Sequence, residues 1–305
     1  MKILFAGTPD SAAIVLKNLV KAGHEVVCVL TREDAPVGRK KVLTESSVAR
    51  AAKSLGIKVI KSNRLSDETI KEVVDTGAEL GIVVAYGVIL RRKALNALRF
   101  GWFNLHYSVL PKYRGAAPIQ WAIINGEKES GLTVFKLDEG MDTGDIVLQM
   151  PMYIHAHETA GDAITRFSEL GSTLLMEILP LIYSGEYKVA PQEGTASIAP
   201  KLVRSDARID FNRNAKQVEA LVRGANPEPM AWCTIDAEPL RVLAVREVPT
   251  NFGNREPGEI VLDKKVYVAC GEGTYIELIE VQPSSKRVMA AADWLRGSSN
   301  IRRLT

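Results

Sequence analysis

The chain has 305 residues, of which 46% are apolar and 25% are charged. This length predicts two domains, and the composition is that of an ordinary globular protein, which excludes wholesale disorder. The net charge of +3 permits an anionic partner without requiring one, so only local clusters of charge can indicate nucleic-acid binding.

The three cysteines, Cys28, Cys233 and Cys270, are far apart and form no CxxC pair. This argues against a disulfide framework and against a cysteine-based zinc site, and it fits a reducing compartment. The opening MKILFAG lacks the long apolar region of a signal peptide, and no apolar stretch reaches the roughly 18 residues of a membrane span. We therefore expect a cytoplasmic protein without membrane contact, and we expect a monomer.

Short apolar runs alternate with helical patterns through the first half of the chain. The run GIVVAYG at 81–87 is apolar without alternation, as in a strand buried on both faces. The predicted strands are 2–7, 25–31, 80–86, 102–105, 133–137 and 146–153, and the predicted helices are 9–22, 47–55, 66–75, 118–125 and 159–183. This alternation predicts a mostly parallel α/β sheet.

The second half has a different texture. Residues 186–205 are rich in Gly, Pro, Ser and Ala, which predicts a linker. A helix at 214–223 follows, and then come short strand-like runs at 232–235, 240–247, 259–262, 265–270 and 275–281. We therefore predict a first domain at 1–185 and a small antiparallel barrel or sandwich at 206–305.

The segment GWFNLHYSVLPKYRG places Asn104 and His106 two residues apart near the end of a predicted strand. Residues at this spacing point to the same face of a strand, so an amide and an imidazole can face one spot. Ligands of open α/β sheets bind at the carboxyl ends of the strands. An isolated Asn-x-His pair is nevertheless more often structural than catalytic.

The segment LDEGMDTGDIV carries three carboxylates, Asp138, Asp142 and Asp145, with glycines that allow tight turns. One of these carboxylates could hydrogen-bond to His106 and hold it in one tautomer or keep it protonated. The alternative is a solvated acidic turn. Calcium is not expected because the EF-hand spacing is absent.

Other sites are poorly supported by the sequence. The first strand ends in FAGTPDSA, which lacks the GxGxxG spacing of a dinucleotide site, and no GxSxG motif of a serine hydrolase occurs. His155 and His157 could chelate a metal, but no further ligands complete a familiar set. We expect no metal.

Taken together, these segments resemble the folate-dependent formyltransferase family. The matching pattern is Asn-x-His-x-Ser-x-Leu-Pro-x-x-Arg-Gly at 104–115, followed by Asp-Thr-Gly-Asp at 142–145. The segments AGTPDSA, AYGVIL, APKLVRSDARIDF and VRGANPEPMAW extend the resemblance over the whole chain, to the branch that formylates methionyl-tRNA. Tyr107 and Val109 depart from the usual pattern, which has a smaller residue and Leu at these positions.

The resemblance implies a Rossmann-like first domain and an OB-like barrel, with 10-formyltetrahydrofolate as formyl donor and the amine of methionyl initiator tRNA as acceptor. It implies that Asn104, His106 and Asp142 are catalytic. A protonated His106 and Asn104 would donate hydrogen bonds to the oxyanion that forms when the amine attacks the formyl carbon. The implied folate-binding residues are Tyr86, Gly87, Val88, Leu90, Ser108, Val109, Leu110, Pro111 and Asp138.

The polar segment 32–46 is longer than most connections between a strand and a helix. The resemblance implies that Arg39, Lys40 and Lys41 in this segment meet the acceptor end of the tRNA. Two alternatives stay open: a formyltransferase with a small acceptor, such as a purine nucleotide precursor or an amino sugar, and a noncatalytic RNA-binding protein. Residues 206–305 contain 14 basic and 14 acidic residues, which is no strongly basic footprint.

Overall fold

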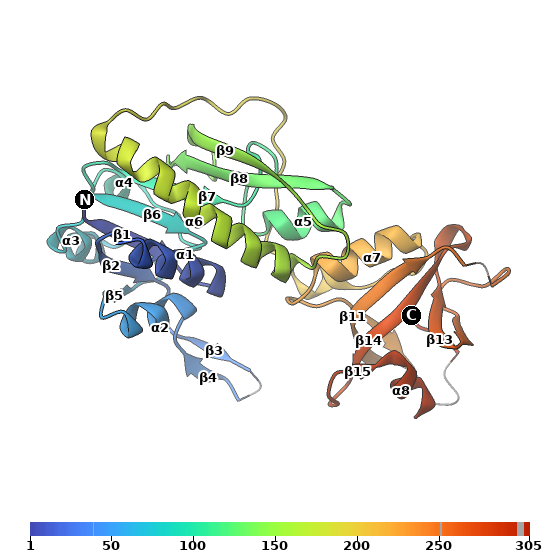
Figure 1. The fold of residues 1–305 in the computed structure, drawn as a ribbon. Helices are drawn as coiled ribbons and strands as arrows, with labels where there is room; N and C mark the ends of the chain where they lie inside the picture. The colour runs from blue at the N-terminus through green and yellow to red at the C-terminus, as the bar shows by residue number, and fades with distance from the viewer. Residues whose placement is uncertain (39, 251, 298–301) are drawn as a thin grey trace. The chain divides into compact units, whose positions relative to one another are not determined.

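A computed structural model describes residues 1–38, 40–250, 252–297 and 302–305 (Figure 1). The chain forms two compact units. The N-terminal unit comprises Met1–Pro118, Ser130–Met152 and Ile164–Pro200, and the C-terminal unit comprises Ile119–Glu129, Tyr153–Ala163 and Lys201–Thr305. The three-part division at residues 185 and 206 stays a prediction.

The N-terminal unit is built on a seven-stranded sheet in the order β5-β2-β1-β6-β7-β8-β9. The strands are β1 (Ile3–Gly7), β2 (Val26–Thr31), β5 (Lys58–Lys61), β6 (Leu80–Val84), β7 (Trp102–His106), β8 (Glu129–Lys136) and β9 (Ile146–Tyr153). The five strands from β5 to β7 pair in parallel, and β8 is antiparallel to β7. The predicted mostly parallel α/β sheet is therefore confirmed.

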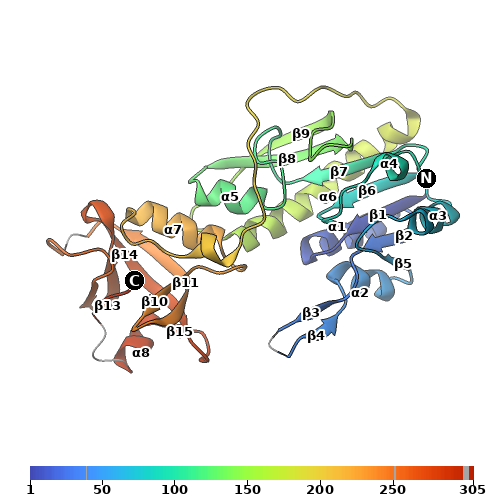
Figure 2. The same cartoon turned by 180° about the vertical axis from the view of Figure 1, so that it is seen from behind.

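Helices cover both faces of this sheet. On one face lie α1 (Asp10–Lys21) and α6 (Ala160–Ser184), joined by a 3.1 Å hydrogen bond from Asn18 to Ser172 (Figure 1). On the other face lie α3 (Asp67–Asp75) and α4 (Arg92–Leu95), whose apolar side chains share one buried cluster with β1, β2, β5 and β6 (Figure 2). The helix α2 (Ser47–Ser54) packs beside α1. The strand β5 and the helix α4, each four residues long, were not predicted from the sequence.

The segment 35–44 differs from the predicted loop. It forms a two-stranded antiparallel hairpin, β3 (Ala35–Val37) and β4 (Val42–Thr44). Both strands of a two-stranded ribbon are edge strands. Pro36 is therefore tolerated, because its missing N–H removes no hydrogen bond from the centre of a sheet. Charged residues and a proline had hidden the strand pattern.

The C-terminal unit holds a curled antiparallel sheet in the order β10-β11-β14-β13-β12, with β15 paired to β14. The strands are β10 (Trp232–Ile235), β11 (Glu238–Val248), β12 (Ile260–Asp263), β13 (Lys265–Ala269), β14 (Tyr275–Pro283) and β15 (Met289–Ala290). Its helices include α5 (Pro118–Ile124), α7 (Ala215–Gly224) and α8 (Ala291–Arg296). The apolar face of α7 packs on β11 and β14 over one buried core. This half-barrel confirms the predicted small β-barrel domain.

Candidate active site

The carboxyl ends of the five parallel strands meet at one edge of the N-terminal sheet, and β7 brings Asn104 and His106 toward this edge. The intervening residue Leu105 and the following Tyr107 point to the opposite face, toward α6. A hydrogen bond of 2.8 Å joins the Tyr107 hydroxyl to Ser168, and burial raises the pKa of Tyr107 to about 12. The two polar residues therefore share one face, as their spacing predicts.

Asn104 is 8% exposed, and its Oδ1 atom is buried without a hydrogen-bond partner among the described residues. A buried polar atom left in this state costs about 1–3 kcal/mol. Such a cost is usual where a side chain serves a ligand instead of the fold. The amide has both donor and acceptor capacity, so it can serve a substrate carbonyl and a substrate N–H.

His106 is 5% exposed, and both of its ring nitrogens face protein atoms. The Nε2 atom lies 2.9 Å from the carbonyl oxygen of Tyr113, and the Nδ1 atom lies 3.7 Å from Oδ2 of Asp142. A carbonyl oxygen can only accept, so the proton of the neutral ring resides on Nε2. The Nδ1 lone pair is then directed toward Asp142.

Burial, partly against the edge-on ring of Phe135, lowers the pKa of His106 below its ordinary value of 6.5, although the carboxylate of Asp142 and the Tyr113 carbonyl raise it. This direction favours the neutral imidazole in the free protein, and the protonated His106 that stabilises the oxyanion stays a prediction. A neutral imidazole with a free Nδ1 lone pair is a base.

Asp142 is held beside His106 by the loop that follows β8. Its Oδ2 atom accepts a 2.7 Å hydrogen bond from the backbone N–H of Gly115. Its backbone has a φ of 54°, a left-handed conformation that is uncommon for a residue other than glycine. Nearby, a Cβ atom at Gly144 would lie 1.8 Å from the carbonyl oxygen of Lys136, so only glycine fits there. The conformation of this loop, with a left-handed Asp142 and no room for a side chain at Gly144, thus determines where Asp142 lies.

Asp138 stabilises the same loop from within. Its carboxylate accepts hydrogen bonds from the backbone N–H of Gly140 and from the hydroxyl of Thr143, the latter at 2.7 Å. The resemblance implies a folate-binding role for this carboxylate. In the structure its oxygens are already bonded to the loop that carries Asp142.

The remaining predicted folate residues lie in two segments that follow the neighbouring strands β6 and β7. Tyr86 is buried, its hydroxyl bonded to the carbonyl of Ser62, and its own carbonyl accepts from Thr8. Gly87 has a φ of 78°, so the chain turns there into Val88 and the buried Leu90. A cavity of about 530 Å³ adjoins this segment, lined by Arg64, Leu65, Ser66, Val88, Ile89 and Arg91.

In the second segment, 108–111, most side chains are buried, and polar groups form hydrogen bonds within the protein. The Ser108 hydroxyl donates to the carbonyl of Lys112, and the carbonyl of Leu110 accepts from Gln149. Pro111 is buried and Val109 is half-buried. Because β6 and β7 are adjacent and parallel, the segments 86–90 and 108–111 leave the sheet side by side.

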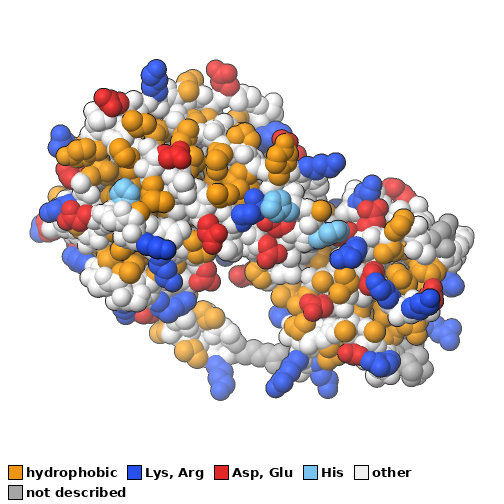
Figure 3. All heavy atoms as spheres, in the orientation of Figure 1, with side chains coloured by type: hydrophobic (Ala, Val, Ile, Leu, Met, Phe, Trp, Pro, Cys, Tyr) orange, Lys and Arg blue, Asp and Glu red, His pale blue; other side chains and the backbone are white. Residues whose placement is uncertain are grey.

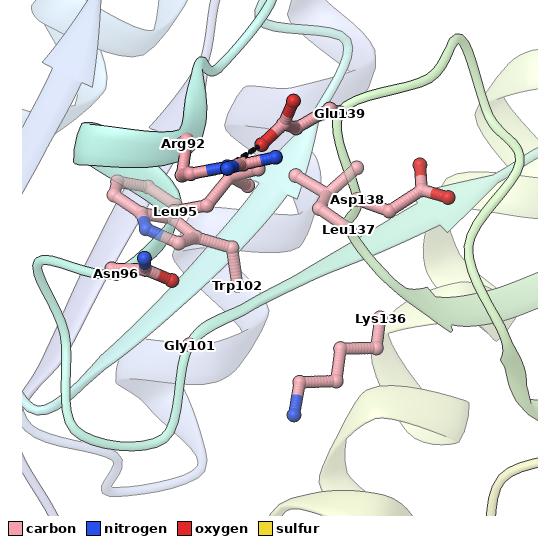
Figure 4. A pocket seen from close by; sticks show the side chains of 9 residues that line it. All are labelled: Arg92, Leu95, Asn96, Gly101, Trp102, Lys136, Leu137, Asp138 and Glu139. Atoms are coloured by element: carbon pink, nitrogen blue, oxygen red, sulfur yellow. Dashed lines mark hydrogen bonds and ion pairs between the residues drawn. The ribbon is translucent and has the colours of Figure 1, made fainter.

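A second cavity, of about 300 Å³, lies away from His106. It is bordered by Trp102 and Gly101 at the start of β7, by α4, and by residues 136–139 (Figure 4). An ion pair between Arg92 and Glu139 closes one side, and the Asp138 carboxylate points away from the indole (Figure 4). Trp102 and His106 are four residues apart, about 13 Å along a strand. This cavity is therefore not part of the Asn104–His106 site.

Two of the predicted tRNA-binding residues, Lys40 and Lys41, are exposed in the turn before β4, and Arg39 lies outside the described residues. Hydrophobic side chains gather over the hairpin, with Val37, Val42 and Leu43 between 56% and 70% exposed (Figure 3). The hairpin follows the carboxyl end of β2, three strands from β7, or about 14 Å at ordinary strand spacing.

Two residues of the site were missed from the sequence, Gln192 and Arg114. The side-chain nitrogens of Arg114 donate to Oε1 of Gln192 at 3.1 and 2.6 Å, and Nε2 of Gln192 donates to the carbonyls of Asp142 and Gly144. Arg114 had been quoted only as part of a motif, and Gln192 lies in the predicted linker. A helix long and apolar enough to span a membrane is absent from the described parts of the chain.

Comparison with known proteins decides the family. Residues 1–179 match the model described as formyl transferase, and residues 201–299 match the formyl transferase C-terminal domain. The chain is 44% identical, over 98% of both chains, to a methionyl-tRNA formyltransferase of Leifsonia xyli, and 43% identical, over 97% of both chains, to one of Arthrobacter sp. (strain FB24). The chain belongs to the methionyl-tRNA formyltransferase family.

Within the formyltransferases, solved structures share this fold at low sequence identity. An N-formyltransferase from Helicobacter canadensis, solved with folinic acid and dTDP-3-aminofucose, superposes with a TM-score of 0.69 at 21% identity, covering 93% of this chain and 99% of that one. The sugar 3N-formyltransferase WlaRD superposes with a TM-score of 0.68 at 19% identity, covering 94% of this chain and 99% of that one. The unusual Tyr107 of this methionyl-tRNA formyltransferase family member faces α6, away from Asn104 and His106.

Proposed function

We propose that the chain transfers the formyl group of 10-formyltetrahydrofolate to the free amino group of methionyl initiator tRNA, in the cytoplasm and as a monomer. The observation that carries this proposal is the grouping of Asn104, His106 and Asp142 at the carboxyl edge of the sheet. The whole-chain similarity to methionyl-tRNA formyltransferases supports the choice of acceptor.

The folate would lie against the segments 86–90 and 108–111. The turn at Gly87 and the cavity beside Val88 offer backbone groups and space for a planar ring. Leu110 and Pro111 supply apolar surface close to the strand end. In this arrangement Asp138 acts by ordering the loop of Asp142, and any contact of Asp138 with folate would have to compete with its bonds to Gly140 and Thr143.

The chemistry we propose is direct attack of the amine on the formyl carbon. The new C–N bond forms, the carbonyl electron pair moves to oxygen, and the Asn104 amide N–H stabilises the resulting oxyanion. The Oδ1 atom of Asn104, which has no hydrogen-bond partner among the described residues, accepts a hydrogen bond from the incoming amine. Collapse of the intermediate breaks the bond between the formyl carbon and N10 of the folate.

His106 and Asp142 handle the proton in this proposal. Neutral His106 takes up the amine proton, through water, at Nδ1, and Asp142 stabilises the imidazolium at 3.7 Å. The proton then passes to N10 of the departing tetrahydrofolate, so the enzyme returns to its starting state. The positive ring also stabilises the neighbouring oxyanion while it exists.

The test uses 10-formyltetrahydrofolate labelled with ¹³C in the formyl group. Incubation with charged initiator tRNA should yield labelled N-formylmethionine on the tRNA, detected by mass spectrometry after hydrolysis. Incubation with folate alone should leave the intact protein unlabelled because attack is direct. Stable formylation of the protein would contradict direct attack, and an unlabelled methionine would contradict the proposed function.

A further inference from the structure

The segment 190–199, here called the crossing segment, lies along two loops of the site. It runs back from α6 over the sheet as an extended trace (Figure 2). Its Ala190 pairs with Ile146, and Ile198 pairs with Arg114. The backbone N–H of Arg114 donates to the carbonyl of Ser197 at 2.8 Å. The crossing segment therefore bonds both to the loop after β7 and to the strand after the Asp142 loop.

Gln192 is the residue of the crossing segment that joins these two loops through its side chain. Its Nε2 atom donates to the carbonyl oxygens of Asp142 and Gly144 at 2.8 and 2.9 Å. Its Oε1 atom accepts from Nε and Nη2 of Arg114 at 3.1 and 2.6 Å. Both N–H groups and both lone pairs of the amide are thus used.

These hydrogen bonds form a closed network that includes Asp142. Gln192 holds the backbone carbonyl of Asp142 and the side chain of Arg114, and Gly115, the next residue after Arg114, donates to the Asp142 carboxylate. Gly115 itself has no room for a side chain, because a Cβ atom there would lie 2.7 Å from the carbonyl of Ala199 in the crossing segment. Asp142 is thereby fixed at both its backbone and its carboxylate.

We propose that Gln192 is a positioning residue for the formyl transfer, which keeps the Asp142 carboxylate directed at Nδ1 of His106. The inference rests on the proposed function for its role in catalysis. Asp142 needs such support because its left-handed backbone is strained and its carboxylate is still 17% exposed. Gln192 has a second effect: as a neutral acceptor it occupies the Arg114 guanidinium, which would otherwise compete with His106 for the Asp142 carboxylate.

The variant Gln192→Met removes all four hydrogen bonds without adding charge and keeps a similar length. Asp142 should then move from His106 or pair with Arg114, and both changes remove a contribution that raises the pKa of His106. The first readout is the titration of ring-¹³C-labelled histidines by NMR in the free protein, which contains four histidines. The His106 resonance, assigned by its loss in His106→Asn, should titrate at lower pH in Gln192→Met than in the parent.

A double-mutant cycle separates positioning from general damage. Asp142→Asn alone should lower the pKa of His106, and adding Gln192→Met to it should cause little further shift, because the two changes remove the same interaction. The matched control is Gln282→Met in the C-terminal unit, where a glutamine likewise accepts from an arginine, Arg241, and donates to a backbone carbonyl. This control should leave the pKa of His106 unchanged.

The second readout is kcat/KM for charged tRNA, which should fall about 10²-fold in Gln192→Met, the usual cost of misplacing a catalytic group by about 1 Å. Gln192→Asn, one methylene shorter, replaces Gln192→Met if the latter does not fold, with the same direction expected. An unshifted His106 titration in a folded variant would overturn the inference. If the His106 titrations come out as expected but the unsubstituted protein formylates no amine, the proposed function is overturned and the positioning of Asp142 by Gln192 still stands.

Discussion

His106 Nδ1 lies 3.7 Å from Asp142 Oδ2, too far for a hydrogen bond and close enough for a charge interaction. The opposite nitrogen of His106 is bonded to the Tyr113 carbonyl at 2.9 Å. Nδ1 of His106 can therefore take up a proton, and the Asp142 carboxylate lies close enough to stabilise the resulting charge. Burial lowers the pKa of the imidazole, and the nearby carboxylate favours the imidazolium once it forms.

This arrangement makes a prediction about pH. Activity should require neutral His106, so kcat/KM should fall as the pH drops through the His106 pKa of the free enzyme. Because burial lowers this pKa, the acid limb should lie below pH 6.5. The measurement is kcat/KM for charged tRNA between pH 5 and 8, with stability checked at each pH. A kcat/KM that instead falls as the pH rises through the His106 pKa would show that the protonated imidazole is the active form.

The second prediction concerns Asn104. Replacement by Ala should lower kcat by roughly 10²–10³, the usual cost of losing one oxyanion donor. Replacement by Val should lower kcat as much while keeping or raising the melting temperature, since it removes a buried oxygen without a partner among the described residues. Thermal unfolding and single-turnover rates on the same samples test this. A large loss of stability in Asn104→Val would show that the amide serves the fold.

The third prediction concerns the three basic residues that the sequence places between β3 and β4. The triple change Arg39→Ala, Lys40→Ala and Lys41→Ala should reduce kcat/KM for charged tRNA and leave folate affinity unchanged. If each of the three cations contacts one phosphate of single-stranded RNA, the tRNA affinity of the triple variant should depend less on salt. The slope of its logarithm against the logarithm of salt concentration should become shallower by about 2 units.

A matched control for the hairpin is Lys17→Ala, Lys21→Ala and Lys71→Ala, which removes the same charge from exposed positions on α1 and α3. Equal losses in both triple variants would point to net charge alone. Unchanged use of tRNA by the hairpin variant at every salt concentration would leave the hairpin as a solvated connection.

The fourth prediction concerns Gly144. A Cβ atom at this position would overlap the carbonyl oxygen of Lys136, so Gly144→Ala must displace the loop that carries Asp142. We expect kcat to fall with little change in folate affinity. Gly126→Ala, where a Cβ would meet open space and the cost comes only from a φ of 74°, is the control for backbone strain without overlap. Normal turnover in Gly144→Ala would show that the loop position does not matter for catalysis.

The sequence predicts best what depends on local periodicity. The spacing of Asn104 and His106 places them on one face because β7 is a regular strand, and unbroken apolar runs such as 80–84 lie in the parallel sheet as expected. The acidic loop was recognised because its carboxylates and glycines lie within eight residues of one another. These features require only a strand and a turn.

What the sequence misses depends on contacts between distant segments. Gln192 lies 48 to 78 residues from its partners, in a stretch without periodicity, so no local pattern marks it. Burial lowers the pKa of His106, an effect that the neighbouring acidic residues in the sequence do not reveal. The hairpin at 35–44 was hidden because its strands are only three residues long, Pro36 lies in one of them, and charged residues separate the two in the sequence.

The most direct test of the proposed formyl transfer is a competition between acceptors. The purified chain receives ¹³C-formyl-labelled 10-formyltetrahydrofolate together with methionyl initiator tRNA, a nucleotide-linked amino sugar and an amine precursor of purine nucleotides, and label in each product is quantified. We expect label on the methionyl amine of the tRNA, in an amount that falls by at least about 10²-fold in His106→Ala. Label on a small amine with none on the tRNA, or undiminished transfer by His106→Ala, would contradict the account.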